Sequence, residues 1–388
     1  MHQSAVDYLV IGGGLAGSMV SMRLAAAGRP VTLVEKERAA HHKVCGEFLS
    51  PEAVDYLRQA GVDPLALGAE TIRFVRLSSK NRMAEAALPF TALSLSRCIL
   101  DEAMLARSAK AGCNVRRGVL VESLTTRDNG WSVQLRDHES LFAQTVFLAN
   151  GKHDLRGWDR RPSPQGDLIG FKLHWQLTPI QTDALRGCLE LFLFPGGYGG
   201  LVLVEGGTAN LCLVVRRARF QRLGGWSELL AAILDDNPHM RQLLEGATAM
   251  WDRPLAISSI PYGYLAGRPS GLWCVGDQAA VIPSFTGDGM SIALHSAALA
   301  AQMVLAGETA AAYHRRLHTQ IGPAMWLATW FSRAMVTGAG RTLAPFGVSL
   351  LPGAMGWIAA STRIPEQALL TESVSCPAGT QKCAVGNR

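Results

Sequence analysis

The first 35 residues alternate between apolar and glycine-rich stretches in an order that predicts a strand, a turn, a helix and a second strand. Residues 7–11 are an apolar run of strand length, and a helical pattern then extends to about residue 27, where Gly28 is suited to end the helix. Residues 31–35 form the second apolar run, which finishes at Glu35. This order is typical of a β-α-β unit with two parallel strands.

Glycines occupy the predicted strand-to-helix turn with the spacing G-x-G-x-x-G, at Gly12, Gly14 and Gly17. The first glycine allows a tight turn, the second lets the backbone approach a pyrophosphate, and the third lets the helix pack closely on the strand. The helix N-terminus offers unpaired N–H groups to phosphates. Glu35 is placed to accept hydrogen bonds from ribose hydroxyls and would repel the 2′-phosphate of NADP. The pattern predicts a dinucleotide site and does not separate FAD from NAD.

A second motif lies more than 240 residues downstream. An apolar run over 272–275 ends in Gly276-Asp277, Pro283 follows, and Gly287-Asp288-Gly289 opens a long helical pattern. This segment resembles the G-D…P…G-x-G element of FAD-dependent enzymes related to para-hydroxybenzoate hydroxylase, geranylgeranyl reductases and flavin halogenases. The resemblance implies that the cofactor is FAD, that Asp277 holds its ribityl chain, and that residues 283–289 lie by the pyrimidine edge of the isoalloxazine. A helix N-terminus there would favour the negative charge of reduced flavin.

Two distant segments thus contribute to one FAD site, so the FAD-binding domain must be interrupted in sequence. We expect an α/β fold with a Rossmann-like FAD-binding domain of the glutathione-reductase type. A β-sheet-rich substrate domain interrupts it, and C-terminal helices follow it. The expected divisions are the first FAD-binding part over 1–165 with a β insertion at about 70–95, the substrate domain over 166–268, the second FAD-binding part over 269–310, C-terminal helices over 311–365, and a loosely ordered tail over 366–388.

Further cofactor contacts follow from the same resemblance. The family has an R-x-x-L/F-D-x-x-L element that places its arginine near FAD, and the corresponding segment here begins at Arg97. An ion pair at the start of a helix is the alternative role for Arg97. Asn150-Gly151 stands where relatives usually carry A-T-G or A-D-G, and the replaced acid leaves the nicotinamide partner open. The remaining expected FAD contacts are Ala16, Lys36, Lys43, Cys45, Gly46, Val121 and Met290.

The stretch HHKVCGEFLS, residues 41–50, admits three interpretations. A metal site would need a fourth ligand, and no second Cys/His pair at ligand spacing provides one, so we expect no metal. A catalytic thiol would need electropositive surroundings, to which Lys43 contributes only a little. The stretch combines the K-x-C-G element of geranylgeranyl-type reductases with the G-E-S-L-x-P-like element of halogenases, which favours a loop against FAD. Cys45 and Glu47 are the candidate catalytic residues of this loop.

Residues 168–215 alternate as strands bounded by Pro-Gly-Gly and Glu-Gly-Gly turns, which predicts a sheet that roofs a substrate cavity. Phe171, His174 and Tyr198 are the candidate substrate contacts. Lys172 and Trp175 could also face the cavity, with plain sheet packing as the alternative for each. Residues 226–247 have a helical pattern, His295 fits a core histidine, and the Trp326, Trp330 and Phe331 stripe fits a core-facing helix.

Composition narrows the classes of protein. The chain has 388 residues, 48% hydrophobic and 18% charged, with a net charge of +6 and no long run of Lys or Arg, which does not favour nucleic-acid binding. The absence of a signal-peptide pattern before the first apolar run predicts a cytoplasmic protein. Residues 342–362 carry no charge but contain prolines and glycines, so we expect packed helices there or a contact with a membrane surface. Cys376 and Cys383 could pair in the polar tail, and the sequence leaves the oligomeric state open.

The resemblance predicts an FAD-dependent oxidoreductase. The favoured function is a monooxygenase that uses NAD(P)H and O2 to hydroxylate an aromatic or polyketide-like substrate, free or carried on a peptide or protein. The alternative is a geranylgeranyl-reductase-like enzyme that reduces prenyl double bonds, favoured by the K-x-C-G element. A flavin halogenase is disfavoured because the G-W-x-W-x-I-P element is absent. A flavin-holding interaction protein without turnover is the alternative outside the enzyme class.

Overall fold

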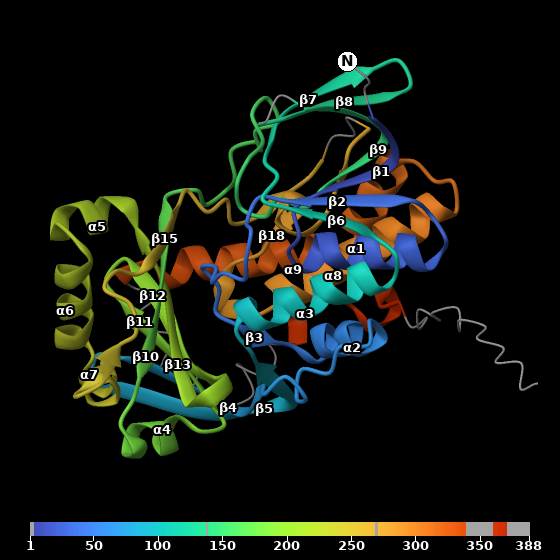
Figure 1. The fold of residues 1–388 in the computed structure, drawn as a ribbon. Coiled ribbons are helices and arrows are strands. Elements are labelled where there is room, and N and C mark those ends of the chain that lie inside the picture. Colours follow the sequence, from blue (N-terminus) through green and yellow to red (C-terminus); the bar gives the residue numbers. More distant parts are fainter. Residues whose placement is uncertain (1–3, 137–138, 268–270, 339–359, 371–388) are drawn as a thin grey trace, which may run out of the picture.

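The computed structural model describes residues 4–136, 139–267, 271–338 and 360–370. These residues form two large β-sheets, and helices cover an outer face of each sheet (Figure 1). One sheet has seven strands in the described ranges and the other has nine, with a separate two-stranded pair between β16 and β18.

The seven-stranded sheet carries the parallel core expected from the N-terminal pattern. Its order is β6-β2-β1-β9-β8-β7, and β17 pairs with β9. Tyr8 lies opposite Val31 on β2 and Thr145 on β9, both in parallel register. The strands are β1 (Ser4–Ile11), β2 (Val31–Glu35), β6 (Asn114–Arg117), β7 (Val121–Arg127), β8 (Gly130–Leu135), β9 (Ser140–Leu148) and β17 (Trp273–Cys274). Strand β17 therefore returns to the sheet from far along the chain.

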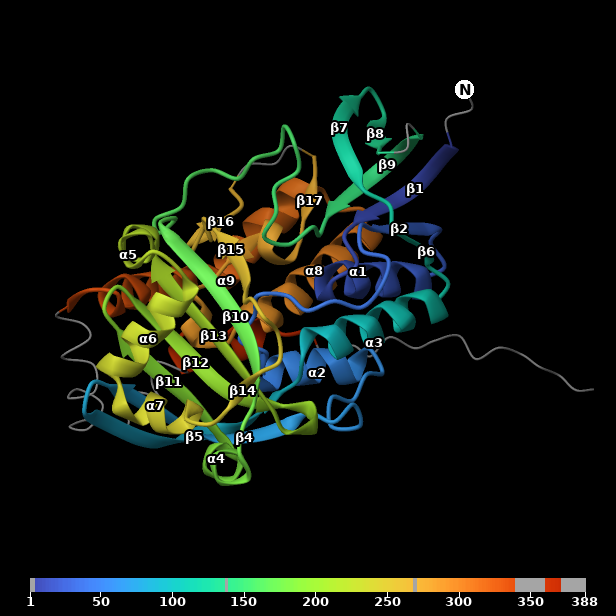
Figure 2. The ribbon, with the colours of Figure 1, turned by 60° about the vertical axis from the view of Figure 1, so that its left-hand side comes forward.

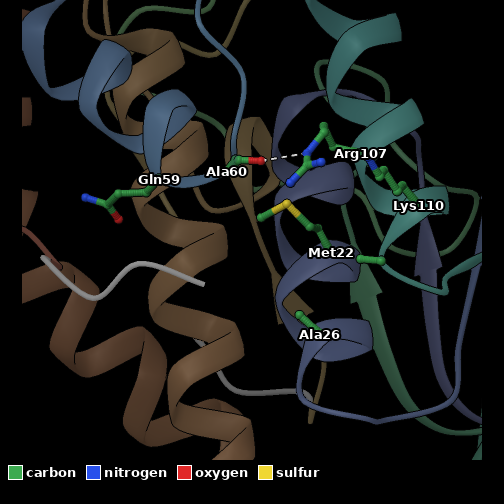
Figure 3. A pocket seen from close by; sticks show the side chains of 7 residues that line it. Met22, Ala26, Gln59, Ala60, Arg107 and Lys110 are labelled. Atoms are coloured by element: carbon green, nitrogen blue, oxygen red, sulfur yellow. Dashed lines mark hydrogen bonds between the residues drawn. The ribbon is translucent and has the colours of Figure 1, made fainter. Parts of the chain in front are cut away.

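Helices α1 (Leu15–Ala26), α3 (Arg97–Lys110) and α8 (Gly289–Leu305) lie together on one face of this sheet (Figure 1). Helix α8 is rich in alanine, and residues such as Ala297 and Ala298 are fully buried, which allows close packing in the shared core. Helix α2 (Pro51–Gln59) lies beside them. Figure 3 shows Arg107 of α3 donating to the carbonyl of Ala60 at the end of α2, at 2.9 Å. The hollow there is only about 10 Å³, room for one water at most.

The nine-stranded sheet combines strands from two separate parts of the chain. Its order is β14-β10-β13-β12-β11-β4-β5-β3, β15 pairs with β10, and β11 runs parallel to β4. The strands are β3 (Phe48–Leu49), β4 (Glu70–Ser79), β5 (Arg82–Ser94), β10 (Leu168–Gln176), β11 (Cys188–Phe194), β12 (Gly197–Val204), β13 (Thr208–Arg216), β14 (Thr248–Ala249) and β15 (Leu255–Ser258). Because β3 to β5 belong to this sheet, the chain enters it soon after the glycine motif.

Helices α5 (Arg217–Leu223), α6 (Trp226–Asp236) and α7 (Pro238–Leu244) cover the outer face of the second sheet, away from α1 and α8 (Figures 1 and 2). The helical pattern over 226–247 forms two helices, α6 and α7. The chain breaks at Asn237, whose side chain caps α7 by accepting from the backbone N–H of Met240 at 3.2 Å. Pro238 has no N–H to continue α6 and suits the first turn of a new helix.

The remaining elements connect these layers. They are α4 (Pro179–Leu185), β16 (Tyr264–Leu265), β18 (Ala280–Val281), α9 (Ala310–Met335) and the short 3₁₀ helices η1 (Glu205–Gly207), η2 (Gly276–Gln278), η3 (Ser284–Thr286) and η4 (Glu366–Ala368). On α9 the prediction of a core-facing aromatic stripe is wrong for its tryptophans, since Trp326 is 71% and Trp330 57% exposed.

The predicted α/β fold class is confirmed, with parallel and antiparallel sheets and helices toward the C-terminus. His295 is a satisfied core histidine, as predicted, with Nδ1 2.8 Å from Tyr56 Oη and Nε2 2.9 Å from Gln320 Oε1. Within the described ranges, no helix is both long enough and apolar enough to span a bilayer. Most of residues 342–362, together with Cys376 and Cys383, lie outside the described residues.

Candidate functional site

A cavity of about 630 Å³ is lined by residues of both sheets and of the helix ends between them. Its volume falls within the range of small-molecule and cofactor sites. Of the predicted cofactor residues, it is lined by Gly12, Gly14, Ala16, Glu35, Lys36, Lys43, Cys45, Gly46, Arg97, Val121, Asn150, Gly151, Gly276, Asp277, Gly287, Gly289 and Met290. Gly17, Pro283 and Asp288 are not part of the lining.

The glycine turn at one end of the cavity has no room for side chains at two of its positions. A Cβ on Gly12, which has φ of 109°, would lie 2.5 Å from the carbonyl oxygen of Ala149. A Cβ on Gly17 would lie 1.8 Å from the carbonyl oxygen of Gly12. Because these positions carry no side chain, β1 and α1 pack closely beside the end of β9. The first turn of α1 then lies in the cavity lining, where its free N–H groups are available to a ligand.

Glu35 lies at the end of β2 and shapes this turn. Its carboxylate accepts from the backbone N–H of Gly13 at 2.6 Å and from that of Glu37 at 2.9 Å. The side chain is buried and still lines the cavity. Its position matches the ribose-binding acid of dinucleotide folds.

The cationic side chains of Arg97 and Lys43 lie close to Gly14. Arg97 Nε and Lys43 Nζ each contact the Asp101 carboxylate at 2.8 Å, and a Cβ on Gly14 would lie 3.5 Å from both cationic groups. Burial works to raise the pKa of Asp101, but the charges of Arg97 and Lys43 outweigh it and lower that pKa. Two positive charges against one negative charge leave an excess of one, which suits an anionic pyrophosphate. Arg97 thus makes a helix-start ion pair and also lines the cavity.

The turn before α8 belongs to the second motif and forms part of the cavity lining. Gly287 has φ of 76°, and a Cβ there would lie 2.4 Å from Cδ1 of Phe48. Asp288 precedes the first residue of α8 and is buried, and its Oδ1 has no hydrogen-bond partner among the described residues. Burial raises the pKa of Asp288 to about 7. Asp288 therefore lies behind the turn, while Gly287 and Gly289 present backbone to the cavity.

Glu47 is fully buried at the base of the 41–47 loop and has a left-handed backbone, with φ of 60°. Its Oε1 accepts from the backbone N–H of Arg97 at 2.8 Å and from the ammonium of Lys172, and its Oε2 lies 3.1 Å from His174 Nε2. Burial works to raise the pKa of Glu47, but the hydrogen bond from His174 and the charge of Lys172 lower it. The carboxylate is ionised and surrounded by donors, so it is better placed to hold the loop than to accept a proton from a substrate.

His42 completes a cluster with these groups. Its ring lies 4.8 Å from that of His174 and 4.9 Å from that of Trp251, and burial and the charge of Lys172 lower its pKa. The donor atoms of His42, Glu47 and His174 lie within 4.8 Å of one another, a spacing that could hold a metal ion. The ammonium of Lys172 already binds the same carboxylate, and a cation beside it would be repelled. Glu47 therefore pairs with Lys172 and His174, while His42 packs against the rings of His174 and Trp251.

Cys45 lines the cavity directly above Glu47 in this loop. Its Sγ accepts from the backbone N–H of Glu47 at 3.4 Å, and its carbonyl accepts from Asn210 Nδ2 at 3.1 Å. All six described cysteines, including Cys45 and the cavity-lining Cys212, are free thiols.

The predicted substrate contacts do not lie in the cavity wall. Phe171 lies on the face of β10 that is turned away from the cavity, and it packs against Phe220 and Trp226. His174 lies behind the 41–47 loop on Glu47. The hydroxyl of Tyr198 lies 3.3 Å from Ser332 Oγ, one layer behind the wall. Side chains alternate across a strand, so Phe171 and His174 cannot share a face.

The wall opposite the glycine turn consists mostly of residues that no motif indicated, together with Val281, Ile282 and Ser284 of the second motif. They come from β13, β15, the segment after β15, β18 with the residue that follows it, and η3, and they are mostly apolar. They are Cys212, Val214, Leu255, Ala256, Ile257, Ile260, Tyr262, Val281, Ile282 and Ser284. For Cys212 and Val214, the strand pattern predicted over 168–215 indicated alternating inward side chains.

Residues 5–147 match the family model described as FAD binding domain. Relatives include Conditioned medium factor receptor 1 of Dictyostelium discoideum, 24% identical over 77% of this chain and 63% of that protein, and menaquinone reductase of Mycolicibacterium smegmatis, 24% identical over 78% and 76%. FAD-dependent monooxygenase OpS4 of Beauveria bassiana is 28% identical over 59% of this chain and 62% of its own length. Alignments to the first and third of these thus span less than two thirds of the relative.

The myxobacterial chondrochloren halogenase CndH is similar in structure, with a TM-score of 0.75 and 19% identity over 96% of this chain and 94% of that chain. This likeness shows the fold. The family match shows an FAD-binding domain over residues 5–147, which the glycine turn and the excess positive charge at Gly14 fit, and the chain is an FAD-dependent oxidoreductase.

Proposed function

We propose that this FAD-dependent oxidoreductase is a monooxygenase that uses NAD(P)H and O2 to hydroxylate an aromatic or polyketide-like substrate. The observation that carries the proposal is the apolar wall opposite the glycine turn, in the same cavity as the FAD-binding elements. The relative from Beauveria bassiana, named an FAD-dependent monooxygenase, supports the same reaction class.

The polar groups of this wall are neutral hydroxyls. Tyr262 is buried, and burial raises its pKa well above the ordinary value, so it stays a neutral phenol. Ser284 hydrogen bonds to Tyr262 and to Tyr198 behind it. An apolar pocket with few neutral polar groups suits an uncharged aromatic molecule and orients it through hydrogen bonds to its own hydroxyls.

The chain's own residues would hold FAD along the whole cavity. Arg97, Lys43 and the N-terminus of α1 would bind the pyrophosphate, Glu35 the ribose and Asp277 the ribityl chain, while the backbone of 287–289 would face the pyrimidine edge. When bound, FAD supplies the redox chemistry, and the protein contributes orientation and the exclusion of water.

In this proposal Glu47 is a positioning residue and Cys45 contacts the reacting region. Glu47 ties the loop to Arg97 of the first domain and to Lys172 of the second sheet, so the loop position depends on both. Cys45 stands on the cavity side of that loop, and its thiol would limit the space beside the substrate.

The alternative is a reductase of prenyl double bonds. The relative named menaquinone reductase and the thiol of Cys45 in the cavity favour it, because a double-bond reduction needs a proton donor beside the hydride donor. Halogenation has the likeness of fold and the G-E-S-L-x-P-like element in its favour, and the missing G-W-x-W-x-I-P element against it.

Oxygen dependence separates the two reactions. The FAD-loaded protein is mixed with NADH or NADPH and a panel of alkylphenols, naphthols and prenylquinones, in isotopically labelled O2 and in its absence, and products are identified by mass spectrometry. We expect a phenolic product that contains one labelled oxygen atom and forms only with O2. Formation of a hydrogenated prenylquinone without O2 would replace this proposal with the alternative. Flavin-free protein is the control for spontaneous oxidation.

A further inference from the structure

Helix α9 presents an outward stripe of unusual composition. With 3.6 residues per turn, Arg315, Trp326, Trp330 and Arg333 lie on one side of the helix, and each of them is exposed. The opposite side is in the protein core, with Tyr313, Leu317, Ile321, Met325 and Ala328 buried. The helix is thus fixed to the protein by one face and leaves the stripe open to a partner.

The two tryptophans are four residues apart, so their side chains neighbour each other on adjacent turns. Trp326 is 71% and Trp330 57% exposed, and Phe331 packs edge-on against Trp330 with ring centroids 5.2 Å apart. Other large exposed hydrophobic residues, such as Ile180 and Met83, lie on different elements. Exposed apolar groups that are gathered together, rather than single, mark an interaction surface.

The Asp, Glu, Lys and Arg residues of α9 are all of one sign. Helix α9 contains Arg315, Arg316 and Arg333 and has neither Asp nor Glu. A protein partner would have to match this surface residue by residue. A bilayer with anionic lipids matches it without such detail, because indole rings partition into the interface and arginines pair with the headgroups.

We propose that the outer stripe of α9, defined by Arg315, Trp326, Trp330 and Arg333, docks the protein onto an anionic lipid surface. The opposite face of α9 is occupied by the protein core, so the contact is interfacial, with the helix lying along the membrane plane. The uncharged sequence 342–362 lies largely outside the described residues and carries no part of this proposal.

The same helix also backs the substrate wall. Ser332 donates to Gln165 Oε1 at 2.8 Å and lies 3.3 Å from the hydroxyl of Tyr198, and Val336 packs in one cluster with Ile260 and Tyr262. A protein docked through α9 would hold its cavity wall close to the lipid. An apolar substrate that dissolves in the bilayer would therefore be concentrated near the enzyme, whichever of the two reactions takes place.

Co-sedimentation of the FAD-loaded protein with lipid vesicles tests the proposal. We expect binding to vesicles of phosphatidylcholine with phosphatidylglycerol, weaker binding to phosphatidylcholine alone, and a decrease with added salt. Trp326→Ser with Trp330→Ser should weaken binding roughly tenfold or more. Arg315→Gln with Arg333→Gln should weaken binding to the anionic vesicles selectively. Ile180→Ser, at an 83% exposed apolar position on another element, is the matched control and should bind like the wild type.

The flavin absorbance spectrum of each variant shows whether the fold is intact, independently of any turnover. Equal vesicle binding by the double tryptophan variant and the wild type would overturn the proposal, as would an absence of binding to every vesicle. If the tryptophan substitutions instead convert a dimer in lipid-free solution to a monomer, the stripe is a protein–protein interface and the lipid proposal fails.

Discussion

The two ends of the cavity are built by different means. At the end near β1, backbone and glycine packing define the turn, where Gly12 and Gly17 leave no room for side chains and Glu35 accepts from the backbone N–H of Gly13. At the end near the second sheet, a buried carboxylate, an ammonium and an imidazole from residues more than 120 positions apart define it. At the first end the glycines that shape the turn lie within one β-α-β unit, which packs against β9, whereas the ion pairs of the second end exist only when two sheets have come together.

This difference predicts different sensitivities. A steric change at the glycine end should prevent the local fold, because backbone cannot move aside. A charge change at the other end should leave the fold and disturb how the loop sits, because the partner groups remain buried without compensation.

Gly17→Val should have the largest effect. Its side chain would collide with the carbonyl of Gly12, which a Cβ alone would approach to 1.8 Å, so α1 could not pack on β1. We expect protein without bound FAD and with a much lower midpoint in thermal unfolding, measured by circular dichroism. Gly267→Ala, at an exposed glycine with only an ordinary contact, is the control and should behave like the wild type. FAD binding of normal affinity by the Gly17 variant would contradict the packing account.

Lys172→Met should come next. It leaves the buried Glu47 carboxylate without its ammonium partner, which costs about 3 to 5 kcal/mol when a fully buried pair is broken. The measurement is the free energy of unfolding in urea, together with the Kd for FAD.

The double variant Glu47→Gln with Lys172→Met removes both charges and should recover part of the loss. Glu122→Gln, in the exposed pair with Arg136, is the matched control and should change stability by less than about 1 kcal/mol. A double variant as unstable as the sum of the two single variants would show that the two side chains do not act as a pair.

Asp288→Asn should have a smaller effect that depends on pH. The pKa of Asp288 is raised to about 7 in the folded protein, whereas an unfolded aspartate titrates near 4. The folded state therefore binds the proton more tightly, and this carboxyl loses stabilisation as pH rises from about 4 through 7. The variant lacks the titration, so its stability relative to the wild type should increase over that window, by on the order of 2 to 4 kcal/mol at pH 8. A difference in unfolding free energy that stays constant between pH 5 and pH 8 would show that Asp288 does not titrate there.

Cys45→Ala should have the smallest effect on stability. Its effect on turnover distinguishes hydroxylation from the reduction of prenyl double bonds. Under hydroxylation the thiol only shapes the cavity, so turnover should fall by less than about tenfold with an unchanged flavin spectrum. A fall of about a hundredfold or more would indicate a lost proton donor and favour the reductase alternative. Cys212→Ala, at the neighbouring thiol of the wall, is the control for a simple loss of volume. Unchanged turnover would remove Cys45 from the mechanism.

The same contrast explains what the sequence could predict. Gly12, Gly14 and Glu35 occupy the positions that their spacing indicated, because the chemistry of a β-α-β turn is local. Phe171 and His174 were both expected in the cavity, although strand alternation places them on opposite faces. The ion pair of Lys172 with Glu47 is a tertiary contact, and no local sequence pattern predicts it. Trp326 and Trp330 fit a helical period, but a period alone does not say which face of α9 meets the core.

The placement of FAD between these two ends is the central claim, and a crystal structure of the FAD-loaded protein tests it most directly. The account predicts the pyrophosphate between Gly14 and the Arg97–Lys43 pair, and the isoalloxazine between residues 287–289 and Cys45, with Glu47 still bound to Lys172. An isoalloxazine outside this cavity, or a Glu47 carboxylate freed from Lys172 and turned toward the ring, would contradict it.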